Sequence, residues 1–372
     1  MNTTEQIKVS VIMPIYNAYD YLKPAMDSVI DQTLREIEIV CIDDGSTDHS
    51  LEIIKEYQKS DSRIRIIPEN NAGPSIARNK GLARCRGEYV IFLDADDFYE
   101  PTLLRKLYDR AVNDRLDIAI AKFDIYNSRK AFFEPAINSD HNEILDGGKV
   151  VSKNEYPDQI LQCATGYVWN KLYRKSFLVE KELNFLPEIR VFEDVYFVST
   201  TLAAADRIGR VDEVLVHHRV YSAQSKNRLF RKYYEQVPLL YARIKSHLMS
   251  RGTFLPLSQS FLNFSASRCY KIYNVLWSDA KEKFWNMLHN AYAEELGWTA
   301  DDIGEVEGEE IHSFVANVLI YNHAQYETRL SMGQTSPMGG VKRAKKNYKQ
   351  RKRVRDFFKW LFGIGRKKNK DD

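Results

Sequence analysis

The residues best suited to chemistry are three aspartates, Asp94, Asp96 and Asp97, which directly follow the apolar run at residues 90–93. The run predicts a buried strand, and in open α/β sheets ligands bind at the carboxyl ends of strands. Carboxylates so close together raise each other's pKa unless a cation lies between them. Oxygen ligands suit Mg²⁺ or Mn²⁺, so we predict a divalent-metal site. The alternative is an aspartate-rich turn in which Asp97 caps a helix.

Apolar runs and helical periodicity alternate through the segment that contains these aspartates. Strands are predicted at residues 8–15, 36–43, 63–68, 89–93 and 118–126, and helices at 21–32, 51–60, 73–85 and 102–113. Such alternation is typical of an α/β fold with a mostly parallel sheet flanked by helices.

Other strands also end in residues that can bind a ligand, which is what a nucleotide pocket at the sheet edge requires. Tyr16 could stack on a base, Asp43 could accept the hydrogen bond of its imide, and Asp94 could hold the ribose. Arg78 could lie along the base or diphosphate as a planar forked donor. An ordinary turn and a solvated helix charge are the alternatives. No GxGxxG follows the first strand and no GxxxxGK[ST] exists, so neither a dinucleotide fold nor a P-loop is indicated. The candidate nucleotide-binding residues are Pro14, Tyr16, Asn17, Asp43, Asp44, Arg78, Asp94 and Ala95.

Four sequence blocks resemble the family 2 glycosyltransferases of the GT-A fold, and they occur in that family's order over roughly residues 8–100. They are VSVIMPIYN, DDGSTD, NAGPSIARNKG and FLDADD. The resemblance implies a nucleotide-sugar donor, usually a UDP-sugar, a divalent cation and inversion at the anomeric carbon. It also implies that Asp94 and Asp96 are the two acids of the DxD motif and that Asp96 ligates the metal.

A second informative region comprises residues 166–174 and 192–197. Inverting transfer needs a general base that takes a proton from the acceptor hydroxyl. Asp194 resembles the family's base, and we predict that Glu193 orients or binds the acceptor; an acidic helix N-terminus is the alternative. The polar segment 128–153 is interpreted as a flexible acceptor-side loop. The predicted acceptor contacts are Trp169, Asn170 and Lys171, although a core position for Trp169 is the more ordinary interpretation.

The strand predicted at residues 211–220 carries the sequence His217-His218-Arg219. Adjacent strand residues point to opposite faces, so at most one histidine faces the site. The resemblance implies a histidine metal ligand near this point, and we select His218, with His217 as the alternative; a structural histidine also fits. Arg219 could neutralise a leaving diphosphate and is counted with the nucleotide-sugar-binding residues.

We predict three further regions in the carboxyl-terminal part of the chain: a helical domain at 229–330, a linker at 331–341 and a basic tail at 342–372. The glycosyltransferase domain would comprise residues 1–228. The helical domain could mediate oligomerisation or acceptor specificity. The tail carries fourteen Lys or Arg and three Asp, whereas the whole chain has a net charge of +3, so the rest carries −8. Residues 357, 360, 361 and 364 form one apolar face, which is typical of a helix lying on an anionic membrane. A nucleic-acid-binding arm or docking on the chain's own acidic body is the alternative.

Composition places the chain in a reducing compartment. The four cysteines form no CxxC pair, no apolar segment resembles a signal peptide, and no apolar run reaches about 18 residues. We expect a cytoplasmic protein, peripheral at the inner face of the cell membrane. The predicted activity is metal-dependent transfer of a hexosyl or N-acetylhexosaminyl group from a UDP-sugar to a glycan or lipid-linked acceptor. This reaction would serve cell-surface polysaccharide synthesis. A nucleotidyltransferase or a non-catalytic nucleotide-sugar-binding protein is the alternative.

Overall fold

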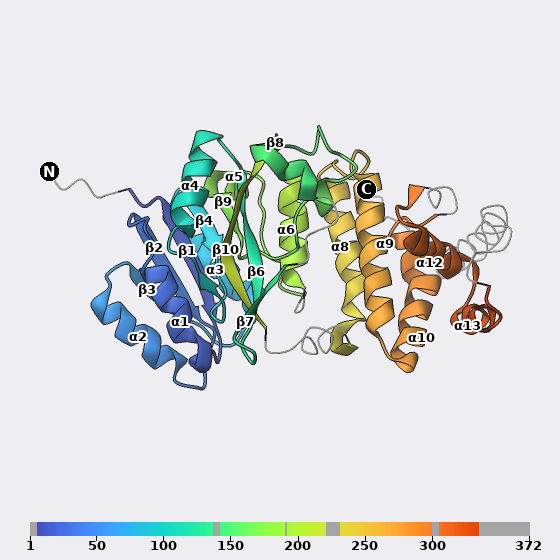
Figure 1. Ribbon diagram of the computed structural model, residues 1–372, viewed down its shortest axis with the longest axis horizontal. Coiled ribbons are helices and arrows are strands. Elements are labelled where there is room, and N and C mark those ends of the chain that lie inside the picture. The colour runs from blue at the N-terminus through green and yellow to red at the C-terminus, as the bar shows by residue number, and fades with distance from the viewer. Residues whose placement is uncertain (1–5, 137–141, 190–191, 221–230, 300–304, 335–372) are drawn as a thin grey trace, which may run out of the picture. The chain divides into compact units, whose positions relative to one another are not determined.

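The computed structural model describes residues 6–136, 142–189, 192–220, 231–299 and 305–334 (Figure 1). These residues form two compact units. The first comprises described residues up to 220 together with 243–261, and the second comprises 231–242 and 262–334. The predicted basic tail and most of the predicted linker lie outside the described residues. The predicted domain boundaries remain a proposal.

The first half of the sheet is parallel, with strand order β3-β2-β1-β4. Strands and helices alternate here as the periodicity predicts, so the α/β class with flanking helices is confirmed (Figure 1). The strands are β1 (Val9–Ile15), β2 (Ile37–Asp43), β3 (Ile64–Pro68) and β4 (Tyr89–Phe92). The helices are α1 (Tyr19–Ile30), α2 (Ser50–Ser60), α3 (Pro74–Arg84) and α4 (Leu103–Asn113).

Beyond β4 the sheet is mixed. The strand β9 (Lys171–Arg174) lies antiparallel between β4 and β6 (Ile118–Asn127), and β10 (Ile208–Val220) runs parallel to β6. Because β9 is antiparallel to β4, the residues before β9 lie at the same sheet edge as the residues after β4. The short strand β5 (Phe98–Tyr99) pairs with β10 and places Phe98 opposite His217. Segments distant in sequence therefore meet at the edge that carries the aspartates.

The prediction of an irregular loop at 128–153 is wrong for much of its described part. Residues of β7 (Phe132–Pro135) pair with the end of β6, and β8 (Val150–Val151) pairs with β10. Between them lies the 3-10 segment η1 (Asn142–Gly148). These strands escaped prediction because they are only four and two residues long, which is too short for an alternating pattern to show.

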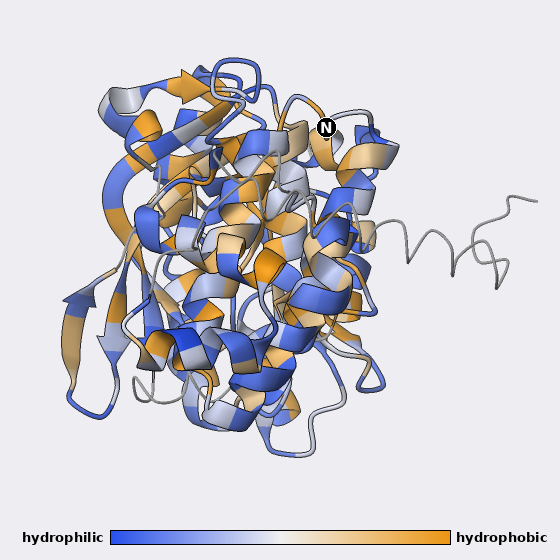
Figure 2. Cartoon of the chain, turned by 90° about the vertical axis from the view of Figure 1, so that its right-hand side faces the viewer, coloured by the Kyte–Doolittle hydropathy of each residue, from blue (hydrophilic) through white to orange (hydrophobic). Residues whose placement is uncertain are grey.

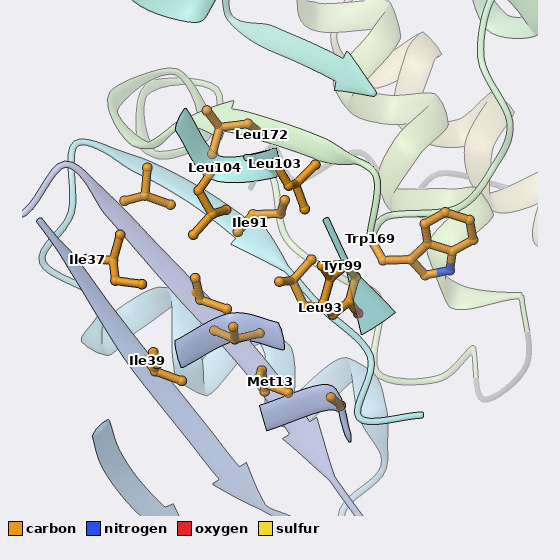
Figure 3. Packing of buried hydrophobic residues seen from close by; sticks show 14 of the residues in the cluster. Met13, Ile37, Ile39, Ile91, Leu93, Tyr99, Leu103, Leu104, Trp169 and Leu172 are labelled. Atoms are coloured by element: carbon orange, nitrogen blue, oxygen red, sulfur yellow. The ribbon is translucent and has the colours of Figure 1, made fainter. Parts of the chain in front are cut away.

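The central strands are buried on both faces, as parallel strands between helix layers must be. One face packs into a hydrophobic cluster that includes Met13, Ile91, Leu93 and Trp169 (Figure 3). On α3, a Cβ atom added at Gly81 would lie 2.4 Å from the Cγ2 atom of buried Ile12 of β1. Helix α3 therefore approaches the sheet closely, and this approach places Arg78 near the sheet edge.

Two further helices of the first unit flank the sheet, α5 (Lys175–Glu180) and α6 (Glu193–Ala204), and η2 (Ile160–Gln162) is a short 3-10 turn. Along the helices that face the viewer in Figure 2, hydrophobic and hydrophilic residues are interspersed, as expected for helices that bury one face.

The second unit is helical and has an aromatic core. Trp285 stacks on Tyr326 with ring centroids 4.2 Å apart, and its indole N–H donates to the Tyr321 carbonyl at 3.0 Å. The unit includes the first residues of α8 (Gln236–Ser250) and most of α9 (Ser258–Val275). Its other elements are α10 (Ser278–Met287), the π-helix η3 (Leu288–Tyr292), α11 (Ala293–Glu295), α12 (Glu309–Ile320) and α13 (His323–Ser331). No helix in the described part of the chain combines the length and apolar character needed to cross a membrane.

Replacing Gly81 by Leu should lower the free energy of unfolding by about 1–3 kcal/mol or more, because the added side chain overpacks against Ile12. Ala83→Leu, on the exposed face of the same helix, is the matched control and should have little effect. Denaturant midpoints of the two variants compare them directly. Equal midpoints would mean that α3 does not depend on this close contact.

Candidate active site

Three carboxylates gather directly after β4. Asp94, Asp96 and Asp97 each offer an oxygen atom, and these oxygens lie within 4.8 Å of one another. Burial, together with the charges of Asp97 and Asp94, raises the pKa of Asp96 to about 7. Burial also raises the pKa of Asp97. The sequence correctly predicts the acidic cluster, and oxygen donors at this spacing fit a hard divalent cation.

The end of β10 braces this acidic turn. The backbone N–H of Arg219 donates to Asp97 Oδ1 at 2.8 Å, and its side-chain Nε donates to the Asp96 carbonyl at 2.8 Å. The guanidinium also lies 5.3–5.5 Å from the ring centroids of Tyr21, Phe98 and Tyr126. Arg219 thus holds the backbone of the cluster, and a contact with diphosphate remains a prediction.

The two histidines point to opposite sides, as the strand geometry requires. His217 lies 2.7 Å from Asp124 Oδ1 through Nδ1 and 3.0 Å from Glu100 Oε1 through Nε2. His218 instead approaches Asp97, with Nδ1 3.1 Å from its Oδ1, and stacks on Trp169 at 5.1 Å. Of the pair, His218 lies beside the acidic cluster. It is not among the three clustered ligand groups, so its role as a metal ligand remains a prediction.

One buried guanidinium joins the cluster to a second acidic pair. Arg78 Nη2 lies 2.9 Å from Asp94 Oδ1, and Nη1 lies 2.9 Å from Glu193 Oε1 and 3.1 Å from Asp194 Oδ1. Only 4% of Arg78 is exposed, so little water screens these ion pairs. The start of α6 and the end of β4 are thereby held on one helix, α3. The guanidinium of Arg78 is paired with carboxylates. Its contact with a nucleotide remains a prediction.

Asp194 is a half-buried carboxylate, its side chain 16% exposed, with unused hydrogen-bonding capacity at its buried Oδ1 atom. The Val168 N–H donates to its Oδ2 at 3.4 Å, whereas Oδ1 makes the Arg78 ion pair without hydrogen-bond geometry to any described group. Burial raises the pKa of Asp194, and the charges of Glu193 and Asp94 raise it further, although Arg78 opposes them. A partly desolvated carboxylate with a raised pKa is suited to accept a proton near neutral pH.

The donor-side candidates lie at the ends of β1 and β2, which the register Ile15↔Asp43 places side by side. Tyr16 is 49% exposed, while Asp43 is buried and its Oδ1 has no hydrogen-bond partner among the described groups. Asp44 has a structural task that the sequence did not reveal, since its two oxygens accept the Ala72 and Gly73 N–H groups at 2.7 and 2.8 Å.

The remaining donor-side candidates are Pro14, Asn17 and Ala95. Pro14 is the sixth residue of β1 and pairs with Ile42 of β2. Asn17 has a positive φ of 48° and accepts the Thr47 N–H at 2.8 Å, which ties the two strand ends together. Ala95 is buried between the first two aspartates of the cluster. None of these contacts tests nucleotide binding.

Trp169, Asn170 and Lys171, the predicted acceptor contacts, are only 1%, 3% and 0% exposed, and a contact with an acceptor remains a prediction. The Trp169 ring stacks on Tyr167 at 4.8 Å and on His218. Asn170 Nδ2 donates to the Ala121 carbonyl at 2.8 Å. The three residues form a layer behind the site. The contact of the Val168 N–H with Asp194 was also missed, and a backbone donor leaves no signal in the sequence.

Comparisons with known proteins identify the family and the fold of the chain. The family model described as "Glycosyl transferase family 2" matches residues 10–179. A cholesterol galactosyltransferase of Borreliella burgdorferi is 30% identical over 314 residues, covering 80% of this chain and 83% of the relative. An uncharacterized glycosyltransferase of Bacillus subtilis, EpsJ, is 34% identical over 215 residues, covering 57% of this chain. The alignment spans only 60% of EpsJ.

Among solved structures, S. aureus TarS 1-349 in complex with UDP-GlcNAc has a TM-score of 0.68 and 21% identity. The match covers 88% of this chain and 92% of that structure, and at this identity it shows a similar fold. The family model and the Borreliella relative establish that the chain belongs to glycosyltransferase family 2.

Proposed function

We propose that the protein transfers a sugar from a nucleotide-sugar, with a UDP-sugar as the preferred candidate, to a hydroxyl of a glycan or lipid-linked acceptor. The reaction would invert the anomeric carbon and serve cell-surface polysaccharide synthesis. The observation that carries the proposal is the Arg78 bridge, which sets the half-buried Asp194 carboxylate beside an acidic cluster. Transfer needs these two parts side by side, one for the donor and one for the acceptor proton.

On the donor side, the proposal assigns the base of the nucleotide to the ends of β1 and β2. The unpartnered Asp43 Oδ1 supports an acceptor role toward a ring N–H, because a buried carboxylate oxygen without a donor is costly. The exposed Tyr16 ring offers a stacking surface. The UDP-GlcNAc in the TarS structure belongs to that protein and supports a uridine nucleotide here by analogy of fold.

The acidic cluster would hold a divalent cation, Mn²⁺ or Mg²⁺. The three oxygens lie close enough to share one ion, and burial of Asp96 and Asp97 without a cation raises their pKa. When bound, such an ion stabilises negative charge that develops on the diphosphate. Asp97 is held by His218 and by the Arg219 N–H, and Asp94 Oδ1 is held by Arg78. Asp96 is the proposed ligand, with His218 beside the cluster as the proposed histidine ligand, and Asp94 is proposed to hold the ribose.

On the acceptor side, Asp194 is the proposed general base. Its carboxylate would take the hydroxyl proton as the acceptor oxygen forms a bond to the anomeric carbon and the bond from that carbon to the diphosphate breaks. Glu193, held by the same guanidinium, would orient the acceptor. Arg78 thus acts as a positioning residue that keeps both acids in place.

A screen of UDP-sugars for Mn²⁺-dependent release of UDP tests the proposed reaction. The assay should follow pyrophosphate as well, because a nucleotidyltransferase would release pyrophosphate instead. Binding of UDP with no product from any sugar would indicate a nucleotide-sugar-binding protein and contradict the proposal.

Asp96→Asn should lower the rate of UDP release by about 10²-fold or more, because a metal ion supplies several kcal/mol of charge stabilisation. Binding of Mn²⁺, measured by calorimetry in the presence of UDP, should weaken in parallel. The control is Asp109→Asn, a neutralised carboxylate on the exposed face of α4. Wild-type activity with unchanged Mn²⁺ dependence in Asp96→Asn would remove the metal assignment.

Asp194→Asn should keep UDP binding and lose transfer by about 10²–10⁴-fold, the range expected for general-base catalysis. Because the pKa of Asp194 is raised, its base form appears at higher pH than for an ordinary aspartate. The wild-type rate should therefore rise with pH near neutrality, and the variant should lack this rise. Weaker UDP binding with normal turnover of bound donor would instead make Asp194 a donor ligand.

The tail at 342–372 lies outside the described residues, and its membrane role remains a proposal from sequence. Each basic residue near an anionic surface contributes about 1 kcal/mol, and the apolar face adds contact that salt does not screen. Deleting residues 341–372 should release the protein from anionic vesicles in a cosedimentation assay. UDP release should be unchanged. Equal sedimentation of both forms would exclude the membrane role, and salt-sensitive binding to nucleic acid would favour the competing interpretation.

A further inference from the structure

We infer that Lys171, the first residue of β9, positions the Asp194 carboxylate by holding the turn at residues 165–170. This inference rests on the proposed role of Asp194 as the base. It gives Lys171 a task that differs from the predicted acceptor contact and that no sequence motif assigns.

The ammonium of Lys171 is enclosed by the turn that leads into its own strand. Nζ donates to the Thr165 carbonyl at 2.9 Å, to the Tyr167 carbonyl at 2.6 Å and to Asn170 Oδ1 at 2.8 Å. The three hydrogens of an ammonium group therefore each have an acceptor. The side chain is fully buried, and no carboxylate of the described residues lies within ion-pair distance of Nζ.

The other side of this turn contacts the proposed base. The Val168 N–H follows the Tyr167 carbonyl directly and donates to Asp194 Oδ2 at 3.4 Å. At Gly166, an added Cβ atom would lie 2.8 Å from Val195 Cγ2 at the start of α6. The turn therefore fits closely against the helix that carries Asp194. Holding the carbonyls on both sides of Gly166 fixes where the Val168 N–H can point.

Charge adds to the positioning effect. Burial lowers the pKa of Lys171 to about 7, and the charges of Cys163 and, to a smaller extent, Asp194 oppose that shift. The groups that face Asp194 are Arg78 of α3, Asp94 after β4, Glu193 of α6, and Tyr173 and Lys171 of β9. Of these, only Arg78 and Lys171 can be cations. Removing the Lys171 charge should therefore raise the pKa of Asp194 further.

A second lysine provides a matched control. Lys153 Nζ donates to the carbonyls of Ala204 and Ala205 at 3.2 and 3.4 Å and pairs with Asp206 at 2.5 Å. Like Lys171, it donates hydrogen bonds to two backbone carbonyls, but its contacts include none of the groups around Asp194. Substitution at Lys153 therefore measures how the loss of such hydrogen bonds changes the stability of the fold without affecting the site.

The test compares Lys171→Met with Lys153→Met in the full chain. Binding of UDP with Mn²⁺ is measured by calorimetry, the melting temperature by scanning, and kcat and donor KM by UDP release from the UDP-sugar found in the screen, with UDP-N-acetylglucosamine tried first. In Lys171→Met we expect UDP binding and donor KM to stay within about threefold of wild type. We expect kcat to fall by about 10²-fold, since small misplacements of a catalytic group have such effects. The rising limb of the pH–rate profile should move to higher pH.

Lys153→Met should lower the melting temperature and leave kcat and the pH profile unchanged. If Lys171→Met behaves in the same way, its lysine is structural only and the inference is overturned. If Lys171→Met does not fold, Asn170→Ala removes one acceptor of the ammonium and should lower kcat several-fold with the same pH shift; a wild-type profile there would overturn the inference. Different results would contradict the proposed function itself: a wild-type protein that releases no UDP, or an Asp194→Asn variant that keeps full activity.

Discussion

The site depends on the burial of negative charge around one guanidinium. Arg78 lies within 3.1 Å of carboxylate oxygens from Asp94, Glu193 and Asp194. Acids this close repel one another and lose hydration, and both effects favour the protonated form. A buried, permanently charged guanidinium offsets part of this cost for all three together. The three acids can therefore share one site as long as α3, the end of β4 and the start of α6 stay in register.

The sheet maintains that register. The parallel strands β1, β2 and β4 bring donor-side residues to one edge, and the antiparallel insertion of β9 next to β4 turns the chain back to the same edge. Strand β10 adds His218 and Arg219 through its pairing with β5 and β6. A purely parallel arrangement would have placed the residues before β9 at the opposite edge. The mixed sheet is thus the means by which the two acidic groups meet.

The residues behind the site are as specific as those that line it. Trp169, Asn170 and Lys171 are buried, yet they stack on His218, bond to β6 and hold the turn beside Asp194. Similarly, both carboxylate oxygens of Asp44 accept hydrogen bonds from the backbone N–H groups just before α3. Polar residues near a site can therefore serve to orient the backbone around it. Their hydrogen bonds are satisfied within the protein, which keeps the site rigid without exposing charge.

The sequence alone determined the alternating strands and helices up to residue 127 and the acidic cluster after β4, because periodicity and adjacency are local properties. It also determined the family, through four blocks within the first hundred residues. Only the tertiary structure decided which side chains contact each other. Arg78 contacts Glu193, which is 115 residues away in the sequence, and His218 rather than His217 approaches Asp97. Burial of Lys171 and the strands β7 and β8 were likewise invisible to local patterns. Such contacts depend on how the sheet is ordered, and that order is set by packing over the whole unit rather than by any short segment.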